Sequence, residues 1–232
     1  MLDKGLFFFL TCGKIEERKA VMTVKKCVIF CAGEFHTLAE PLDGAFIIAA
    51  DGGYAHTQKL GITPDLILGD FDSLGFVPTG ANVHPVEKDD TDAMLAIRAG
   101  LEAGCTDFVI YGALDGPRLD HTVANLQSLL YLAAHGARGT LIGLNNIITT
   151  VRNETLVFPG DFAGTVSLFT LGKPAKLTIR GLKYELEDGC LTPDFPLGVS
   201  NHFLGAQSSV TVKDGCVLAI LDTANGMRWR YE

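Results

Sequence analysis

Two aspartates separated by one residue are the side chains best suited to chemistry in this sequence. Asp70 and Asp72 flank Phe71, directly after a short apolar run. Alternate side chains of an extended segment point to the same side, so both carboxylates would face one point. Close carboxylates repel each other unless a cation lies between them, and Mg²⁺ prefers such oxygen ligands and neutralises phosphate charge. The pair predicts a magnesium site, and the alternative is a surface turn with solvated acids.

A second acidic group lies where a helix is predicted to begin, in the segment Lys88-Asp89-Asp90-Thr91-Asp92. Asp90 or Thr91 would cap that helix, because short polar side chains accept hydrogen bonds from its first backbone N–H groups. Capping accounts for one or two of these acidic residues. It does not account for three of them with a lysine in front, so we expect the segment to contribute to a site.

Arg118, Asp120 and His121 form a third group, between a predicted strand and a predicted helix that carries Asn125. Arginine makes bidentate contacts to phosphate. Three roles stay open for Asp120, which could bind a metal, hold the arginine or accept a proton. For His121 we favour packing or hydrogen bonding over a role as a base.

Gly52 and Gly53 follow Asp51 at the end of another predicted strand. Glycine allows close backbone approach, so amide groups here could face a phosphate. The alternative is an ordinary turn between a strand and a helix. The sequence contains no GxxxxGK[ST] motif, which excludes a Walker-type phosphate loop.

All these groups follow, or lie close to, the ends of predicted strands in the first part of the chain. Continuous apolar runs of strand length occur at residues 27–31, 45–50, 66–68, 108–111 and 140–144. Continuous runs are typical of strands that are covered on both faces. In an open parallel sheet, ligands bind beyond the carboxyl ends of the strands, where these residues would lie.

Helical spacing of apolar residues separates these runs. Met94, Ile97 and Leu101 recur on one helical face, and Val123, Leu126 and Leu130 do the same. Gly104 would end the first of these helices. Strands that alternate with helices predict an α/β fold, with a mostly parallel sheet and helices on both sides.

The pattern changes after residue 145. Short β-type runs separated by Gly, Pro, Asn and Asp occur at residues 147–151, 155–158, 165–171, 177–182, 208–212 and 217–221. They predict a smaller antiparallel β-sandwich. We therefore expect an N-terminal extension over residues 1–24, a mostly parallel α/β/α domain over 25–145 and a β-sandwich domain over 146–232.

Composition narrows the classes of function. The chain of 232 residues has a formal net charge of −8, which argues against a general nucleic-acid binder. Its six cysteines show no CxxC spacing and several lie in apolar runs, so we expect reduced thiols in the cytoplasm, not a zinc site. The apolar block at residues 6–10 is too short to span a bilayer, and we expect no membrane association.

Four motifs, in this order, resemble those of the thiamine pyrophosphokinase family. They are Asp51-Gly52-Gly53, Gly69-Asp70-Phe71-Asp72-Ser73, Lys88-Asp89-Asp90-Thr91-Asp92, and Arg118-Leu119-Asp120-His121 with Asn125. The likeness is strong from residue 27 to about residue 132. Beyond residue 145 it rests on the β-rich texture and on Gly198-Val199-Ser200-Asn201.

The resemblance implies an α/β domain that binds ATP and Mg²⁺, and a β-sandwich that binds thiamine and forms homodimers with shared thiamine sites. It implies transfer of diphosphate from ATP to the hydroxyl of thiamine, with release of AMP. The residue roles that it implies are Asp70, Asp72 and Asp92 as magnesium ligands, Lys88 and Arg118 as contacts of the ATP phosphates, Asp51, Gly52 and Asn125 at the nucleotide site, Asp120 near the substrate hydroxyl, and Ser200 and Asn201 near the thiamine pyrimidine.

Two other readings of the same residues stay open. The Asp70–Asp72 pair could serve a nucleotide-sugar transferase or an aspartate-nucleophile phosphatase, although such a phosphatase normally carries its pair after the first strand. A non-catalytic nucleotide or vitamin sensor could use the same pocket without turnover. Formation of AMP from ATP that depends on thiamine separates these alternatives from the kinase.

Overall fold

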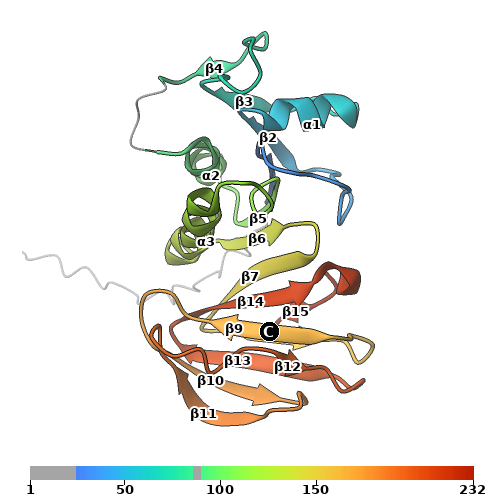
Figure 1. The fold of residues 1–232 in the computed structure, drawn as a ribbon, viewed down its shortest axis with the longest axis vertical. Coiled ribbons are helices and arrows are strands. Elements are labelled where there is room, and N and C mark those ends of the chain that lie inside the picture. The colour runs from blue at the N-terminus through green and yellow to red at the C-terminus, as the bar shows by residue number, and fades with distance from the viewer. Residues whose placement is uncertain (1–24, 86–89) are drawn as a thin grey trace, which may run out of the picture.

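The structure is a computed structural model that describes residues 25–85 and 90–232. The predicted N-terminal extension, residues 1–24, and Lys88 lie outside the described residues. Figure 1 shows an upper part, in which helices flank strands, and a lower part built from strands.

One ten-stranded sheet runs through both parts (Figure 1). Its strands, in spatial order, are β12 (Asn201–His202), β9 (Thr165–Phe169), β14 (Cys216–Asp222), β7 (Asn146–Arg152), β6 (Arg138–Ile142), β5 (Asp107–Tyr111), β1 (Lys26–Phe30), β2 (Phe46–Ala50), β3 (Leu66–Gly69) and β4 (Asn82–Val83). Neighbours from β4 to β6 pair in parallel, and neighbours from β6 to β12 pair antiparallel.

The predicted parallel sheet with helices on both sides is confirmed. The helices α2 (Asp92–Glu102) and α3 (Leu119–Ala134) pack on one face of the parallel strands through Ile97, Leu129 and Leu132. The short helix α1 (Gly53–Lys59) lies across the sheet from them (Figure 1). Strand β1 is buried on both faces, which explains its continuous apolar sequence.

Helix α2 begins and ends where its sequence predicts. The Thr91 hydroxyl accepts a hydrogen bond from the Met94 N–H (3.2 Å), so Thr91 is the N-cap and Asp92 is the first helical residue. After the C-cap at Ala103, Gly104 adopts a φ of +79°, as glycine after a helix end commonly does. The cap therefore places Asp92 at the sheet edge.

The second half of the chain forms two layers. A five-stranded antiparallel sheet has the order β11 (Leu186–Leu191), β10 (Ala175–Arg180), β13 (Ser208–Asp214), β8 (Thr155–Phe158) and β15 (Arg230–Tyr231). It packs on β7, β9 and β14 through an apolar core that contains Phe158, Val217 and Leu221. The predicted antiparallel second region is confirmed. One of its layers continues the parallel sheet across residue 145, so the division into domains at that point stays a proposal.

The order of the parallel strands creates a switch point between β1 and β5. The chain moves from β1 outward to β2 and β3, and later from β5 in the opposite direction to β6. The connections after β1 and β5 therefore leave on opposite faces of the sheet. Such switch points leave a crevice at the carboxyl ends of the strands, where open α/β sheets bind ligands.

Candidate active site

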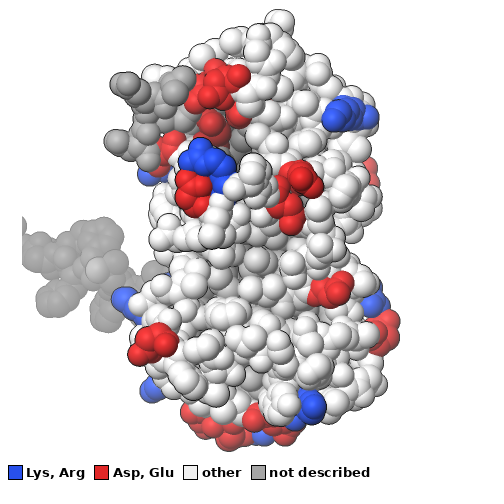
Figure 2. Space-filling model, viewed as in Figure 1, with Lys and Arg blue, Asp and Glu red and all other residues white. Residues whose placement is uncertain are grey.

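A cavity of about 530 Å³ lies at this switch point. Its walls come from the residues that follow β1, β2, β3 and β5 and from the first turns of α2 and α3. Acidic side chains and a basic one surround a hollow in the upper part of the molecule (Figure 2). The volume suits a small-molecule ligand.

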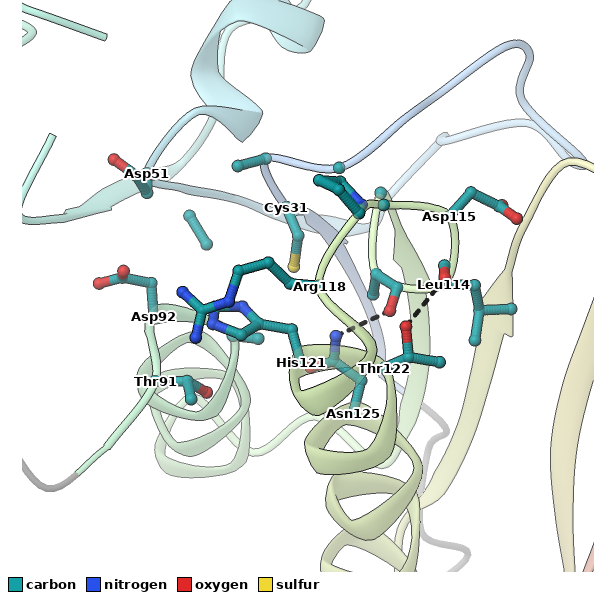
Figure 3. A pocket seen from close by; sticks show the side chains of 18 of the residues that line it. Cys31, Asp51, Thr91, Asp92, Leu114, Asp115, Arg118, His121, Thr122 and Asn125 are labelled. Atoms are coloured by element: carbon teal, nitrogen blue, oxygen red, sulfur yellow. Dashed lines mark hydrogen bonds between the residues drawn. The ribbon is translucent and has the colours of Figure 1, made fainter. Parts of the chain in front are cut away.

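Three carboxylates meet at one end of the cavity. Asp51, Asp70 and Asp92 each offer one oxygen, and these oxygens lie within 4.8 Å of one another. Asp51 follows β2, Asp70 follows β3 and Asp92 begins α2, so segments distant in sequence converge here. Figure 3 shows the Asp51 and Asp92 carboxylates at the same end of the cavity. Two of the three predicted magnesium ligands are thus brought together.

The third predicted ligand, Asp72, lines the same cavity but is not a member of this group. The segment from Asp70 to Asp72 is not extended, because Phe71 adopts a φ of +60° and its ring is buried. The Asp72 N–H donates to Asp70 Oδ1 (3.4 Å), as in a tight turn. The alternation that predicts two carboxylates on one side therefore does not hold, and Asp72 as a ligand stays a prediction.

The donor set of the group fits a hard divalent cation. All three residues supply oxygen, the ligand atom that Mg²⁺ prefers. Asp51 is only 8% exposed, and its Oδ1 is buried without a hydrogen-bond partner among the described residues. A buried carboxylate oxygen without a partner is costly, and a bound cation would supply the missing partner.

Arg118 supplies positive charge on the opposite wall. It precedes α3 and lines the cavity, and its side chain reaches toward the acidic end (Figure 3). Its guanidinium donates two hydrogen bonds to Asp120, from Nε to Oδ1 (3.1 Å) and from a terminal nitrogen to Oδ2 (2.5 Å). Of the roles open for Asp120, the structure shows that of holding the arginine. Arg118 keeps the pKa of the Asp120 carboxyl at about 2, so this carboxyl stays ionised.

Helix α3 holds the loop that carries Arg118. Asn125 is buried, and its Nδ2 donates to the Ala113 carbonyl (2.7 Å), while Thr122 Oγ1 donates to the Leu114 carbonyl (3.1 Å; Figure 3). Asn125 also lines the cavity. His121, for which we expect packing or hydrogen bonding, is exposed and lines the cavity because the first turn of α3 faces the opening. The packing role is therefore wrong, and hydrogen bonding stays a prediction.

The paired glycines bring α1 close to β1. A Cβ on Gly53 would lie 1.9 Å from the Phe30 carbonyl oxygen, so only glycine fits there. A Cβ on Gly52 would lie 2.8 Å from the Ala32 Cβ and 2.9 Å from the Ser73 Oγ. Gly52 does not line the cavity, although Asp51 beside it does. The geometry supports the turn interpretation, and phosphate contact by Gly52 stays a prediction.

Matches to known proteins cover both halves of this arrangement. Residues 42–141 match the family model described as "Thiamin pyrophosphokinase, catalytic domain", and residues 146–217 match "Thiamin pyrophosphokinase, vitamin B1 binding domain". The chain belongs to the thiamin pyrophosphokinase family.

Individual relatives agree with this family. A "Thiamine pyrophosphokinase" of Bacillus subtilis (strain 168) is 26% identical over 193 residues, which cover 76% of this chain and 86% of the relative. The crystal structure of thiamine pyrophosphokinase from Bacillus subtilis has a TM-score of 0.71 at 23% identity and covers 84% of this chain and 98% of that one. For the yeast enzyme the TM-score is 0.68 at 14% identity, with 88% of each chain covered. The two solved structures show a shared fold.

Ser200 and Asn201 lie in the segment matched by the vitamin B1 binding model, and they do not line the cavity of their own chain. Asn201 is buried. Its Oδ1 accepts from the Tyr184 N–H (2.9 Å), and its Nδ2 donates to the Tyr184 carbonyl (2.7 Å). Ser200 is exposed at the start of β12. Thiamine contact by either residue stays a prediction.

Sequence reasoning missed two features of the cavity. It placed Asp51 at the nucleotide and not in the acidic group, although its position after β2 put it at the same edge as Asp70. It also assigned no role to Cys31, which directly follows β1 and lines the cavity. Burial, with smaller contributions from Asp92 and Asp51, raises the pKa of the Cys31 thiol to about 12. The thiol therefore stays neutral.

Proposed function

We propose that this chain is an ATP:thiamine diphosphotransferase that requires Mg²⁺. The observation that carries the proposal is the meeting of three carboxylates and one arginine in a cavity at the switch point of the sheet. Diphosphate transfer needs positioning and charge neutralisation more than covalent chemistry by the protein. The substrates, ATP and thiamine, are inferred from membership of the family.

Residues at the two ends of the cavity would have different roles in this transfer. Asp70 and Asp92, with Asp72 as a predicted further ligand, would hold Mg²⁺, which supplies charge neutralisation for the phosphate oxygens when bound. Arg118 can offer its planar guanidinium to a phosphate in a bidentate contact. Its present partner, Asp120, is an exposed carboxylate, and exposed ion pairs contribute little to stability because water screens them. The exchange of Asp120 for a phosphate therefore costs little.

An arginine taken up by phosphate would leave the Asp120 carboxylate free to accept a hydrogen bond. The thiamine hydroxyl is the donor that the proposed reaction brings to this place. Asp120 would then orient the hydroxyl for in-line attack on the β-phosphorus, and AMP would leave. Lys88 as a further phosphate contact remains a prediction outside the described residues.

We also propose that the chain works as a homodimer. Four large apolar side chains of the lower part are more than half exposed: Tyr184 (57%), Phe195 (64%), Leu197 (54%) and Leu204 (61%). The segments that carry Tyr184 and Leu204 are joined by a hydrogen bond from the Lys183 N–H to the His202 carbonyl. A second copy of the chain would cover these apolar side chains. In such a dimer, Ser200 of one copy could lie at the cavity of the other copy.

A reducing, cytoplasmic setting completes the proposal. Five described cysteines are free, and three of them, Cys27, Cys31 and Cys105, are buried. Free buried thiols are typical of proteins from reducing compartments. No helix among residues 25–85 and 90–232 is long and apolar enough to cross a bilayer.

The activity is tested by incubation with thiamine, ATP and Mg²⁺, followed by separate quantification of AMP and ADP. We expect AMP and thiamine diphosphate in equal amounts, with no AMP when thiamine or Mg²⁺ is omitted. Formation of ADP would indicate transfer of a single phosphate, and ATP consumption that does not depend on thiamine would indicate a hydrolase. Binding of both ligands without turnover would indicate a sensor and contradict the proposal.

A further inference from the structure

Asp51 has a geometry that its turn alone does not require. It adopts a φ of +48°, a left-handed conformation that is uncommon for residues other than glycine, although aspartate adopts it more readily than most. Gly69 on the adjacent strand packs against it, because a Cβ on Gly69 would lie 3.0 Å from the Asp51 Cα. The Asp51 N–H donates to the Leu68 carbonyl (2.8 Å). The ends of β2 and β3 are thus locked together, which brings Asp51 and Asp70 to the same end of the cavity.

The two carboxylate oxygens of Asp51 have different surroundings. Oδ2 accepts a hydrogen bond from the Ser73 hydroxyl (2.7 Å), which fixes the rotation of the carboxylate. Oδ1 is buried and accepts no hydrogen bond from the described residues. The same carboxylate supplies one of the oxygens that lie within 4.8 Å of oxygens of Asp70 and Asp92. Oδ2 is therefore anchored, whereas Oδ1 has no partner among the described residues, in a carboxylate that lies close to those of Asp70 and Asp92.

A structural role for Asp51 explains the bond to Ser73 but not the unpaired oxygen. A buried carboxylate oxygen that lacks a hydrogen bond destabilises the fold, and neighbouring carboxylates add repulsion. Such a cost is typical of sites where function and not folding selects the side chain. A divalent cation among the three carboxylates removes both costs.

We propose that Asp51 is a direct ligand of the divalent cation, together with Asp70 and Asp92, and that the Ser73 hydroxyl orients it. This inference rests on the metal dependence in the proposed function, and it goes further by moving Asp51 from the nucleotide to the metal. Ser73 is then a positioning residue that acts through Asp51, because hydrogen bonds to a ligating carboxylate set its orientation.

The test measures Mn²⁺ binding to the full-length protein without nucleotide, from the electron paramagnetic resonance signal of free Mn²⁺. We expect Asp51→Asn to raise the Kd for Mn²⁺ roughly 100-fold, and Ser73→Ala to raise it about 10-fold, as for residues that orient metal ligands. Asp115→Asn is the matched control. It removes a carboxylate from the same cavity, but Asp115 points away from the acidic end (Figure 3) and its Oδ2 accepts from the Leu144 N–H. Its Kd should stay close to that of the wild type, because its carboxylate is not a member of the acidic group.

Thermal unfolding separates a ligand from a structural anchor. Asn keeps an acceptor for Ser73 and removes the charge, so in EDTA the Asp51→Asn variant should melt at or above the wild-type temperature. The rise in melting temperature that Mg²⁺ produces in the wild type should be lost, because only the native state binds the cation. A lower melting temperature in EDTA, with Mn²⁺ binding within about twofold of wild type, would overturn the proposal, as would a wild-type protein that binds no Mn²⁺.

These outcomes can be told apart from failure of the proposed function. If Asp51→Asn loses Mn²⁺ and the wild type forms no AMP from ATP and thiamine, the metal ligand stands and the reaction is wrong. If the wild type forms AMP and Asp51→Asn binds Mn²⁺ normally, the reaction stands and Asp51 is not a ligand.

Discussion

The carboxyl edge of the parallel strands and the antiparallel layers below it differ in the buried charge that they carry. At the edge, Asp51 and Phe71 adopt left-handed backbone conformations, and an acidic group leaves the Asp51 Oδ1 without a hydrogen bond from the described residues. In the lower layers, the buried polar side chain of Asn201 is satisfied by the backbone. Left-handed residues other than glycine also occur in the lower part, at Asn153, Asp188 and Ser200, and the buried Ser208 hydroxyl there has no hydrogen-bond partner among the described residues. The group of carboxylates is therefore what distinguishes the edge, and gathered charge of this kind is typical of ligand sites.

The difference shows how one continuous sheet carries two tasks. The lower strands extend the sheet that carries the cavity, so the packing of the lower part also supports the upper edge. The carboxyl edge can then tolerate the local loss of stability that its gathered carboxylates cause. Three perturbations, from the largest expected effect to the smallest, test this division.

The lower core is the place where a single change should cost most. Phe158 is fully buried and contacts the rings of Phe162 (5.8 Å between centroids) and Phe203 (5.2 Å). We expect Phe158→Ala to lower the free energy of unfolding by about 3–5 kcal/mol, the cost of a large cavity. Urea denaturation followed by circular dichroism measures this change.

The same experiment tests the continuity of the sheet. A single transition is expected because both parts share one sheet. The helical signal of the upper part and the fluorescence of Trp229, which packs on the cores of both parts, should then be lost together. Two separate transitions would show that the parts unfold independently. Val83→Ala is the control, since Val83 is 60% exposed on β4 and should change stability by less than about 0.5 kcal/mol.

The acidic edge should respond in the opposite sense, with a large loss of activity and little loss of stability. We expect Asp92→Asn to lower kcat by about 10²-fold or more, as for lost electrostatic stabilisation at a reacting phosphate. The sequence predicts a similar loss for Asp72→Asn. Steady-state formation of AMP measures both. Near-normal turnover of Asp72→Asn would remove Asp72 from the ligand set and leave the group that contains Asp51.

The sequence predicted the site's members better than their geometry. Apolar runs located β1, β2, β3, β5 and β6 because buried strands are apolar throughout, and the residues after them were therefore assigned to one edge. The turn at Phe71 was not predictable, because an Asp-Phe-Asp segment carries no glycine to mark a left-handed residue. Its conformation follows from burial of the Phe71 ring, which is a tertiary contact.

The strands that the sequence missed lack the same signal. In β11, Glu187, Asp188 and Cys190 are exposed and Gly189 interrupts the pattern, so neither a continuous apolar run nor a regular alternation marks it. The two-residue strands β4, β12 and β15 are too short for any periodicity. Their pairing depends on neighbours already in place. The continuation of the main sheet past residue 145 could not be predicted for a related reason. The sequence of one strand does not determine which other strand it pairs with.

The adjacent residues Asn201 and Ser200 provide the test with the smallest expected effect. We expect Asn201 to stabilise the fold and Ser200 to serve the ligand site. Asn201→Ala removes two part-buried hydrogen bonds to the Tyr184 N–H and carbonyl, which should lower the free energy of unfolding by about 1 kcal/mol. Ser200→Ala removes an exposed hydroxyl and should change stability by less than about 0.5 kcal/mol. If Ser200 contacts thiamine, this second variant should raise the KM for thiamine and leave that for ATP unchanged. Urea denaturation and initial rates at varied thiamine concentration measure both variants. An Asn201→Ala variant with wild-type stability and a raised KM for thiamine would instead place Asn201 at the substrate, because the loss of a side chain that stabilises the fold would lower the free energy of unfolding.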